Sequence, residues 1–137
     1  MHQTIQESVV GMPRVLVVED EPLVRMAVAD SLELAGFKVV EAGTGDEALS
    51  LLSRGVPPVD LVFTDVRMPG RVDGFALCAW VKQHLPAIPV FIASGDIGKT
   101  HSRDELAPGQ PFFSKPYSVD AVISRMKLEL RSKLQIA

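Results

Sequence analysis

The sequence predicts an α/β fold in which a five-stranded parallel sheet is covered by helices on both faces, a three-layer α/β/α arrangement. Short β-branched blocks alternate with segments whose apolar residues recur at helical spacing, and five of each follow one another along the chain. Strands joined through helices need right-handed crossovers, which make neighbouring strands parallel. The 137 residues fit one domain, and we expect it to span residues 14–137 after a flexible leader, residues 1–13.

Composition excludes several classes of protein. The chain is 47% hydrophobic with a formal net charge of -3, which is typical of a globular protein and gives no basic surface for nucleic acid. Its single cysteine, Cys78, has no intramolecular disulfide partner, and the N-terminal segment lacks the features of a signal peptide. Charged residues and prolines interrupt every apolar run, so we expect no membrane insertion and a cytoplasmic location.

The first half of the chain alternates between strand and helix twice. The block RVLVVE, residues 14–19, has the composition of a strand buried on both faces, and residues 22–35 follow with helical spacing. Residues 37–42 repeat the strand composition. The motif TGDE, residues 44–47, matches a capping box, and we expect the helix that it opens to end at Gly55.

The second half of the chain continues the alternation. We expect strands at DLVFT, residues 60–64, and IPVFIAS, residues 88–94, with the helix FALCAWVKQHL, residues 75–85, between them. A fifth strand, residues 111–115, begins on a proline, which suits the edge of a sheet. The last helix follows Ser118, a good N-cap residue.

One predicted helix is weak. Residues 97–106 are polar and include Gly98, so a helix there gains little from burial or propensity. We expect this segment to be short or mobile.

Polar residues follow four of the predicted strands. Glu19 and Asp20 lie at the carboxyl end of the first strand, Asp65 at that of the third, Ser94 at that of the fourth and Lys115 at that of the fifth. Ligands of open α/β sheets bind outside the carboxyl ends of the strands, so we expect these side chains to form one constellation.

The chemistry of this constellation points to phosphoryl transfer. Three carboxylates repel one another unless a cation bridges them, and an all-oxygen site suits Mg²⁺. Attack by Asp65 on a phosphoryl group would give an aspartyl phosphate, while Lys115 and the metal neutralise the oxygens of the transition state. Ser94 would donate its hydroxyl to a phosphoryl oxygen.

The same residues resemble the response-regulator receiver family, the CheY-like domains, from about Arg14 onward. The resemblance rests on the acidic pair Glu19-Asp20, on Asp65 within TDVRMPG, on Ser94 within IASG and on Lys115-Pro116 within FFSKPY. It implies a flavodoxin-like sheet of order 2-1-3-4-5.

The resemblance also implies roles for individual residues. Asp65 is the phosphoacceptor, and Glu19, Asp20 and Asp65 hold Mg²⁺, or Mn²⁺ as a substitute, together with the backbone carbonyl of Arg67. A sensor histidine kinase or a histidine phosphotransfer protein supplies the phosphoryl group.

By the same resemblance, Phe112 occupies the position of the switch aromatic, which turns inward when Ser94 moves toward the phosphate. The alternative for Phe112 is a plain core residue. The resemblance also implies a cis Lys115-Pro116 bond.

Two features depart from the common receiver pattern. Arg71 and Val72 both stand between MPG and the DG turn, where one residue is usual, so we expect the loop beside Asp65 to bulge differently. Asp96 adds an acid near the mouth of the site, and we hypothesise that Arg67 and Asp96 approach each other and restrict the hydrolytic water. Two solvated charges are the alternative.

The sequence thus predicts a single-domain response regulator that catalyses only its own phosphorylation and dephosphorylation and signals through an unidentified downstream protein. Residues 97–106, the fifth strand and the last helix form the expected readout face, which would also serve a homodimer. A phosphorelay intermediate or a hybrid-kinase receiver is the nearest alternative. A Mg²⁺-dependent phosphohydrolase is disfavoured because Arg67, not an acid, lies two residues after Asp65, and a flavodoxin-like binding module leaves the acids unexplained.

Overall fold

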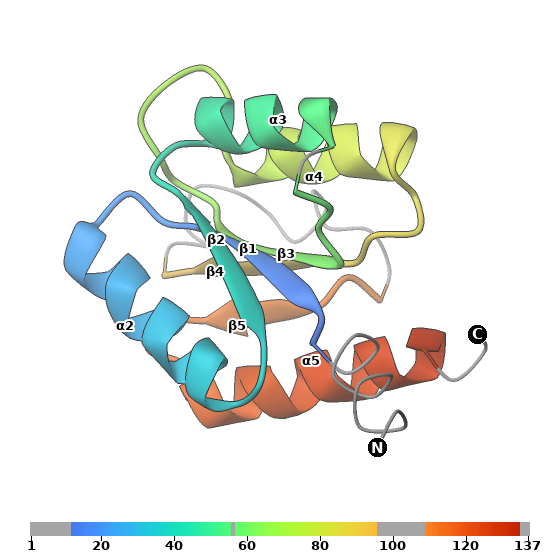
Figure 1. Cartoon of the computed structure of the whole chain (residues 1–137). Coiled ribbons are helices and arrows are strands. Elements are labelled where there is room, and N and C mark those ends of the chain that lie inside the picture. Colours follow the sequence, from blue (N-terminus) through green and yellow to red (C-terminus); the bar gives the residue numbers. More distant parts are fainter. Residues whose placement is uncertain (1–11, 56, 96–108, 135–137) are drawn as a thin grey trace.

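A parallel sheet of five strands, in the order β2-β1-β3-β4-β5, lies between two pairs of helices in the computed structural model (Figure 1). The structure describes residues 12–55, 57–95 and 109–134. The predicted fold class and strand order are confirmed. The elements are β1 (Arg14–Val18), α2 (Pro22–Leu34), β2 (Lys38–Ala42), α3 (Gly45–Arg54), β3 (Leu61–Asp65), α4 (Gly74–His84), β4 (Val90–Ser94), β5 (Phe112–Ser114) and α5 (Val119–Leu134).

Alternate residues of the strands face opposite layers of helices. In β1, Val15 and Val17 pack into one core cluster with α2 and α5, whereas Leu16 and Val18 pack into a second cluster with α3 and α4. Figure 1 shows the two helix pairs on opposite faces of the sheet. Because both faces of β1 are covered, the strand is apolar and buried from Val15 to Val18, as its composition predicts.

Some boundaries differ from the prediction by one or two residues. β4 begins at Val90 and not at residue 88, because Pro89 has no N–H and Ile88 still bonds in a turn to the carbonyl of Leu85 at 3.0 Å. α4 begins at Gly74, one residue early, since Asp73 caps it by accepting the Ala76 N–H at 2.8 Å.

The predicted helix caps are found at α3 and α5. Thr44 accepts the Glu47 N–H at 3.0 Å, and Ser118 accepts the Ala121 N–H at 3.2 Å. The second half of the capping box differs, because the Glu47 carboxylate accepts the Gly43 N–H at 2.8 Å in place of the N–H of Thr44.

Two predicted segments fall outside the described residues. They are the weak helix at 97–106 and all but the last residues of the leader, so four helices are described. None of the helices described has both the length and the apolar character that crossing a bilayer requires.

Candidate functional site

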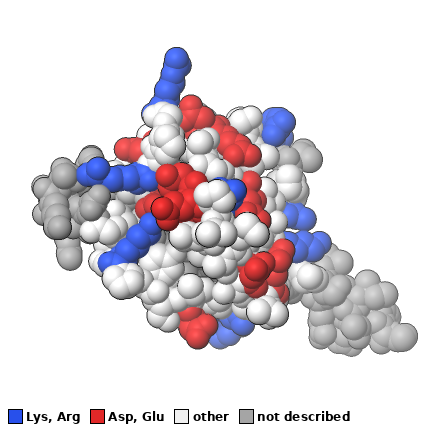
Figure 2. Space-filling view, turned by 90° about the vertical axis from the view of Figure 1, so that its left-hand side faces the viewer, with Lys and Arg blue, Asp and Glu red and all other residues white. Residues whose placement is uncertain are grey.

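The carboxyl ends of the strands gather acidic side chains near the middle of one face, with basic side chains beside them (Figure 2). Asp65 is the last residue of β3 and Ser94 the last of β4, while Glu19 and Lys115 directly follow β1 and β5. In the parallel register Asp65 lies opposite Ala93 and Ser94 opposite Ser114, so the ends of β3, β4 and β5 are level. The predicted convergence of these residues is therefore found.

Asp65 is held from two sides. One carboxylate oxygen, Oδ1, accepts the N–H of Val66 at 2.9 Å, and the other, Oδ2, accepts a hydrogen bond from Lys115 Nζ at 2.9 Å. The Asp65 side chain is 11% exposed and that of Lys115 is 34% exposed. The carboxylate is thus fixed in orientation, paired with a cation and still reachable from solvent.

Glu19 and Asp20 complete an acidic cluster with Asp65. One carboxylate oxygen from each of the three residues lies within 4.8 Å of the others, a spacing that could hold a metal ion. Glu19 is buried and Asp20 exposed. Glu19 Oε1 lies 3.6 Å from Lys115 Nζ, and its Oε2 accepts the Glu21 N–H at 3.1 Å, so Lys115 bridges two of the three acids.

Burial and the neighbouring charges shift the pKa values of two groups in the cluster. Burial raises the pKa of Glu19 above its usual 4.5, against the lowering effect of the Glu21 N–H, and the charge of Asp65 raises it further. Burial by itself lowers the pKa of Lys115, but the hydrogen bond and charge of Asp65 and the charge of Glu19 raise it above 10.5 overall. The site therefore favours added positive charge.

Ser94 and Phe112 lie on the neighbouring strands. Ser94 is 4% exposed, and its carbonyl accepts the Lys115 N–H at 3.1 Å, which ties β4 to the residue after β5. Phe112 is partly buried and packs against the core cluster on the α3 and α4 side of the sheet. Its role as a switch stays a prediction.

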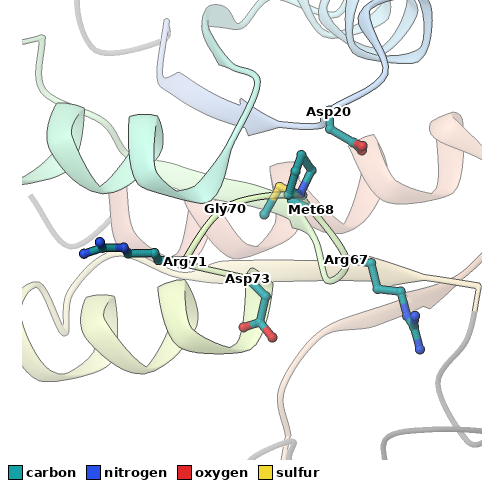
Figure 3. A pocket seen from close by; sticks show the side chains of 7 residues that line it. Asp20, Arg67, Met68, Gly70, Arg71 and Asp73 are labelled. Carbon is teal, nitrogen blue, oxygen red and sulfur yellow. The ribbon is translucent and has the colours of Figure 1, made fainter.

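An open hollow of about 540 Å³ lies beside Asp20, one of the three clustered acids. Asp20 lines one side, and the loop from Arg67 to Asp73 lines the other (Figure 3). The side chains of Arg67 and Arg71 extend in opposite directions from this loop. Arg67 lines the hollow two residues after Asp65, whereas Asp96, the partner hypothesised for it, lies outside the described residues.

Two residues beside the site, Arg25 and Tyr117, were not predicted from the sequence. Arg25 donates from Nη1 to the backbone carbonyl of Glu19 at 2.8 Å and from Nε to Glu41 at 3.1 Å, so it supports the acidic turn from α2. Tyr117 packs edge-on against Phe63, with ring centroids 5.7 Å apart. Local sequence gave no signal for either contact, because each joins segments that the fold brings together.

The peptide bond that precedes Pro116 also matches its prediction. The Lys115-Pro116 bond is cis.

The chain matches known proteins over most of its length. A family model described as the response regulator receiver domain matches residues 15–127. The transcriptional regulatory protein BaeR of Escherichia coli O6:H1 is 33% identical over 120 residues, which cover 87% of this chain and 48% of BaeR. The chain spans about half the length of the curated relatives that it matches.

Two solved structures share the fold at appreciable identity. The receiver domain of the hybrid histidine kinase CckA is 32% identical with a TM-score of 0.67, and the match covers 85% of this chain and 98% of that one. The response regulator TrrA of Thermotoga maritima, solved in complex with Mg(2+)-BeF, is 26% identical with a TM-score of 0.73, and the match covers 86% of this chain and 99% of TrrA. On the combined grounds of the family match, the sheet order and the acidic cluster, this chain belongs to the response regulator receiver family.

Proposed function

We propose that Asp65 accepts a phosphoryl group from a phosphohistidine on a partner protein and that the aspartyl phosphate is the signal. The observation that carries this proposal is the setting of Asp65, whose Oδ2 lies 2.9 Å from Lys115 Nζ beside the acids Glu19 and Asp20. An oriented carboxylate next to a fixed cation suits nucleophilic attack on phosphorus, because the incoming group is itself an anion.

The transfer is a direct displacement. A carboxylate oxygen of Asp65 forms a bond to phosphorus while the bond between phosphorus and the donor imidazole nitrogen breaks, and the electron pair of that bond stays on the nitrogen. Lys115 neutralises charge on the phosphoryl oxygens, and Ser94 donates its hydroxyl to one of them. The chain catalyses its own modification and does not turn over an external substrate.

The acids fit a hard divalent cation. Glu19, Asp20 and Asp65, with the backbone carbonyl of Arg67, would hold Mg²⁺, because the donors are all oxygen and the carboxylates repel one another without a cation. Mn²⁺ has the same preference for oxygen and would substitute. When bound, the metal supplies positive charge toward the phosphoryl oxygens.

The signal would leave through protein contacts in the cytoplasm, without direct binding to nucleic acid. The added charge can shift a conformational equilibrium only if the two conformations bind the phosphoryl group differently. Ser94 and Phe112 are the residues that would register this difference. The homodimer face predicted from residues 97–106, β5 and α5 stays a prediction, since its first segment is outside the described residues.

A second role is favoured by one comparison. The likeness to the receiver of a hybrid histidine kinase supports a chain that passes its phosphoryl group on to a histidine phosphotransfer protein. Transfer kinetics from radiolabelled protein to candidate histidine domains distinguish the two roles. Rapid, complete transfer supports the relay, and retention of label on this chain supports the terminal regulator.

The test of the proposed function uses a small phosphodonor. Native protein incubated with MgCl₂ and acetyl phosphate should gain the mass of one phosphoryl group, whereas Asp65→Asn should gain none, as measured by intact mass spectrometry. Omission of MgCl₂ is the matched control and should abolish the gain. Equal modification of native protein and Asp65→Asn would rule out Asp65 as the acceptor.

A further inference from the structure

The loop between β3 and α4 is attached to the first turn of α3. The carboxylate oxygen Oδ1 of Asp46 accepts two backbone hydrogen bonds, from the N–H of Arg71 at 3.1 Å and from the N–H of Val72 at 3.0 Å. Arg71 and Val72 are the two residues that intervene between MPG and DG, where a receiver usually has one. One carboxylate oxygen thus accepts the hydrogen bonds of both backbone N–H groups at the position of the extra residue.

Two glycines show how closely the loop and the helix approach. A Cβ atom on Gly45 would lie 2.0 Å from the carbonyl oxygen of Val72. This distance is far shorter than a van der Waals contact, so a side chain at position 45 would force the two backbones apart. Gly70 adopts a φ of 107°, and a Cβ atom there would lie 2.9 Å from Asp46 Oδ1. The tip of the loop therefore rests directly on the backbone of α3.

The base of the loop is fixed separately. The N–H of Gly74 donates to the carbonyl of Val66 at 2.8 Å, next to Asp65. The residues between this base and the Asp46 contact form one wall of the 540 Å³ hollow that Asp20 lines from the other side. The loop whose tip Asp46 holds thus carries the residues that face Asp20 across the hollow, Arg67 among them (Figure 3).

We propose that Asp46 is a positioning residue for the metal site and that it acts through the amides of Arg71 and Val72. It touches neither the metal nor the phosphoryl group. Its hydrogen bonds hold the loop that begins at Arg67, the residue whose carbonyl would complete the metal site, and loss of such outer contacts typically weakens metal binding by about 10- to 100-fold. This inference rests on the proposed function, because it concerns the same Mg²⁺ site.

The experiment measures Mg²⁺ affinity without any phosphodonor, by titrating MgCl₂ into the full chain in a calorimeter at physiological salt. Asp46→Ala removes the acceptor and should weaken Mg²⁺ binding by about tenfold, in line with other outer contacts of metal sites. Asp46→Asn keeps a side-chain oxygen at the same place and should bind Mg²⁺ about as tightly as the native protein, although it lacks the charge. The Asn variant thus separates positioning from the long-range effect of a negative charge.

Gly45→Ala provides an independent variant. It keeps the Asp46 carboxylate and adds a better helix former, yet its Cβ would push Val72 away. It should therefore weaken Mg²⁺ binding as Asp46→Ala does. Asp60→Ala is the matched control, because Asp60 Oδ2 accepts a backbone N–H from Arg14 at 2.8 Å at the amino ends of β1 and β3, away from the acids at the carboxyl ends, and Mg²⁺ affinity should not change.

A second measurement observes the loop directly. Hydrogen exchange of the Arg71 and Val72 amides, resolved by NMR, should accelerate in Asp46→Ala and stay near native in Asp46→Asn. Equal Mg²⁺ affinity in native protein and Asp46→Ala would overturn the inference and leave the proposed function intact. Absence of Mg²⁺ binding by the native protein would overturn the proposed function, whatever the amide exchange shows.

Discussion

Tyr117 joins the apolar core to the charged site. Its ring packs against Phe63, and a gap of about 10 Å³ at the end of β1 and β3 is lined by Tyr117, Glu19 and Asp65. Burial raises the pKa of Tyr117 above its usual 10.0, the charge of Lys115 lowers it, and the two carboxylates raise it again. The charges of the site thus influence the pKa of a tyrosine that packs against the core.

This pKa can be measured because the chain has one tyrosine. Absorbance at the phenolate band during alkaline titration should show a midpoint above 10.0 in folded protein and near 10.0 in urea. Since the folded state disfavours the phenolate, the free energy of unfolding should be unaffected below pH 10 and should fall as pH rises through the raised pKa. Coincident midpoints in folded and unfolded protein would contradict the assigned burial.

Individual residues also show how far sequence reasoning reaches at the site. Glu19, Asp65, Ser94 and Lys115 were predicted together because each lies at the carboxyl end of a strand, and the carboxyl ends of parallel strands lie side by side. Asp46 was not predicted, since nothing in a helix's first turn indicates that a loop will rest on it. Such contacts depend on loop geometry, which residue type and spacing do not determine.

At the scale of elements, α2 has one buried and one exposed side. Leu32 is 1% exposed and packs under β1, whereas Leu34, two residues later on the same helix, is 90% exposed. Helical periodicity predicted which face of this segment is apolar, but the exposed Leu34 shows that an apolar residue type alone does not identify a core position.

These two leucines form a matched pair for a stability test. Leu32→Ala should lower the free energy of unfolding by about 2–5 kcal/mol, because it leaves a cavity in a packed core. Leu34→Ala should change it by less than about 0.5 kcal/mol, since that side chain is already in water. Urea denaturation followed by far-UV circular dichroism provides both values. Similar losses in the two variants would argue against the orientation of α2.

The loops were less predictable than the helices and strands. The fold class, strand order and caps at Thr44 and Ser118 followed from composition, periodicity and resemblance. The extra residue between β3 and α4 predicted only that the loop would differ, whereas its hydrogen bonds to Asp46 join segments 25 and 26 residues apart and leave no mark in the local sequence. The period of apolar residues indicates helices and strands from the sequence alone, whereas the partners of a loop depend on which segments the fold brings together.

At the scale of the whole molecule, the sheet couples two apolar clusters. The cluster with α2 and α5 includes Phe91, and the cluster with α3 and α4 includes Ile92, so consecutive residues of β4 serve both. Neither cluster can lose its packing without exposing one face of the same strands. We therefore expect the described layers to unfold as one cooperative unit.

Trp80 makes this testable, because it is the chain's single tryptophan and packs on the α3 and α4 side. Its fluorescence and the far-UV circular dichroism should give the same urea midpoint. Leu32→Ala, on the other side of the sheet, should shift both midpoints equally. A fluorescence midpoint that stays native in Leu32→Ala would show that the two layers unfold independently.

The order of the residues along the chain has a consequence for synthesis. Glu19 and Asp20 leave the ribosome first, Asp65 follows, and Lys115 comes only with the residues after the edge strand β5. A nascent polypeptide therefore carries its acids long before the ammonium group that pairs with them. The ion pair that orients Asp65 can close only after residue 115 has emerged, so a stalled fragment that stops short of Lys115 would display the carboxylates without their cation.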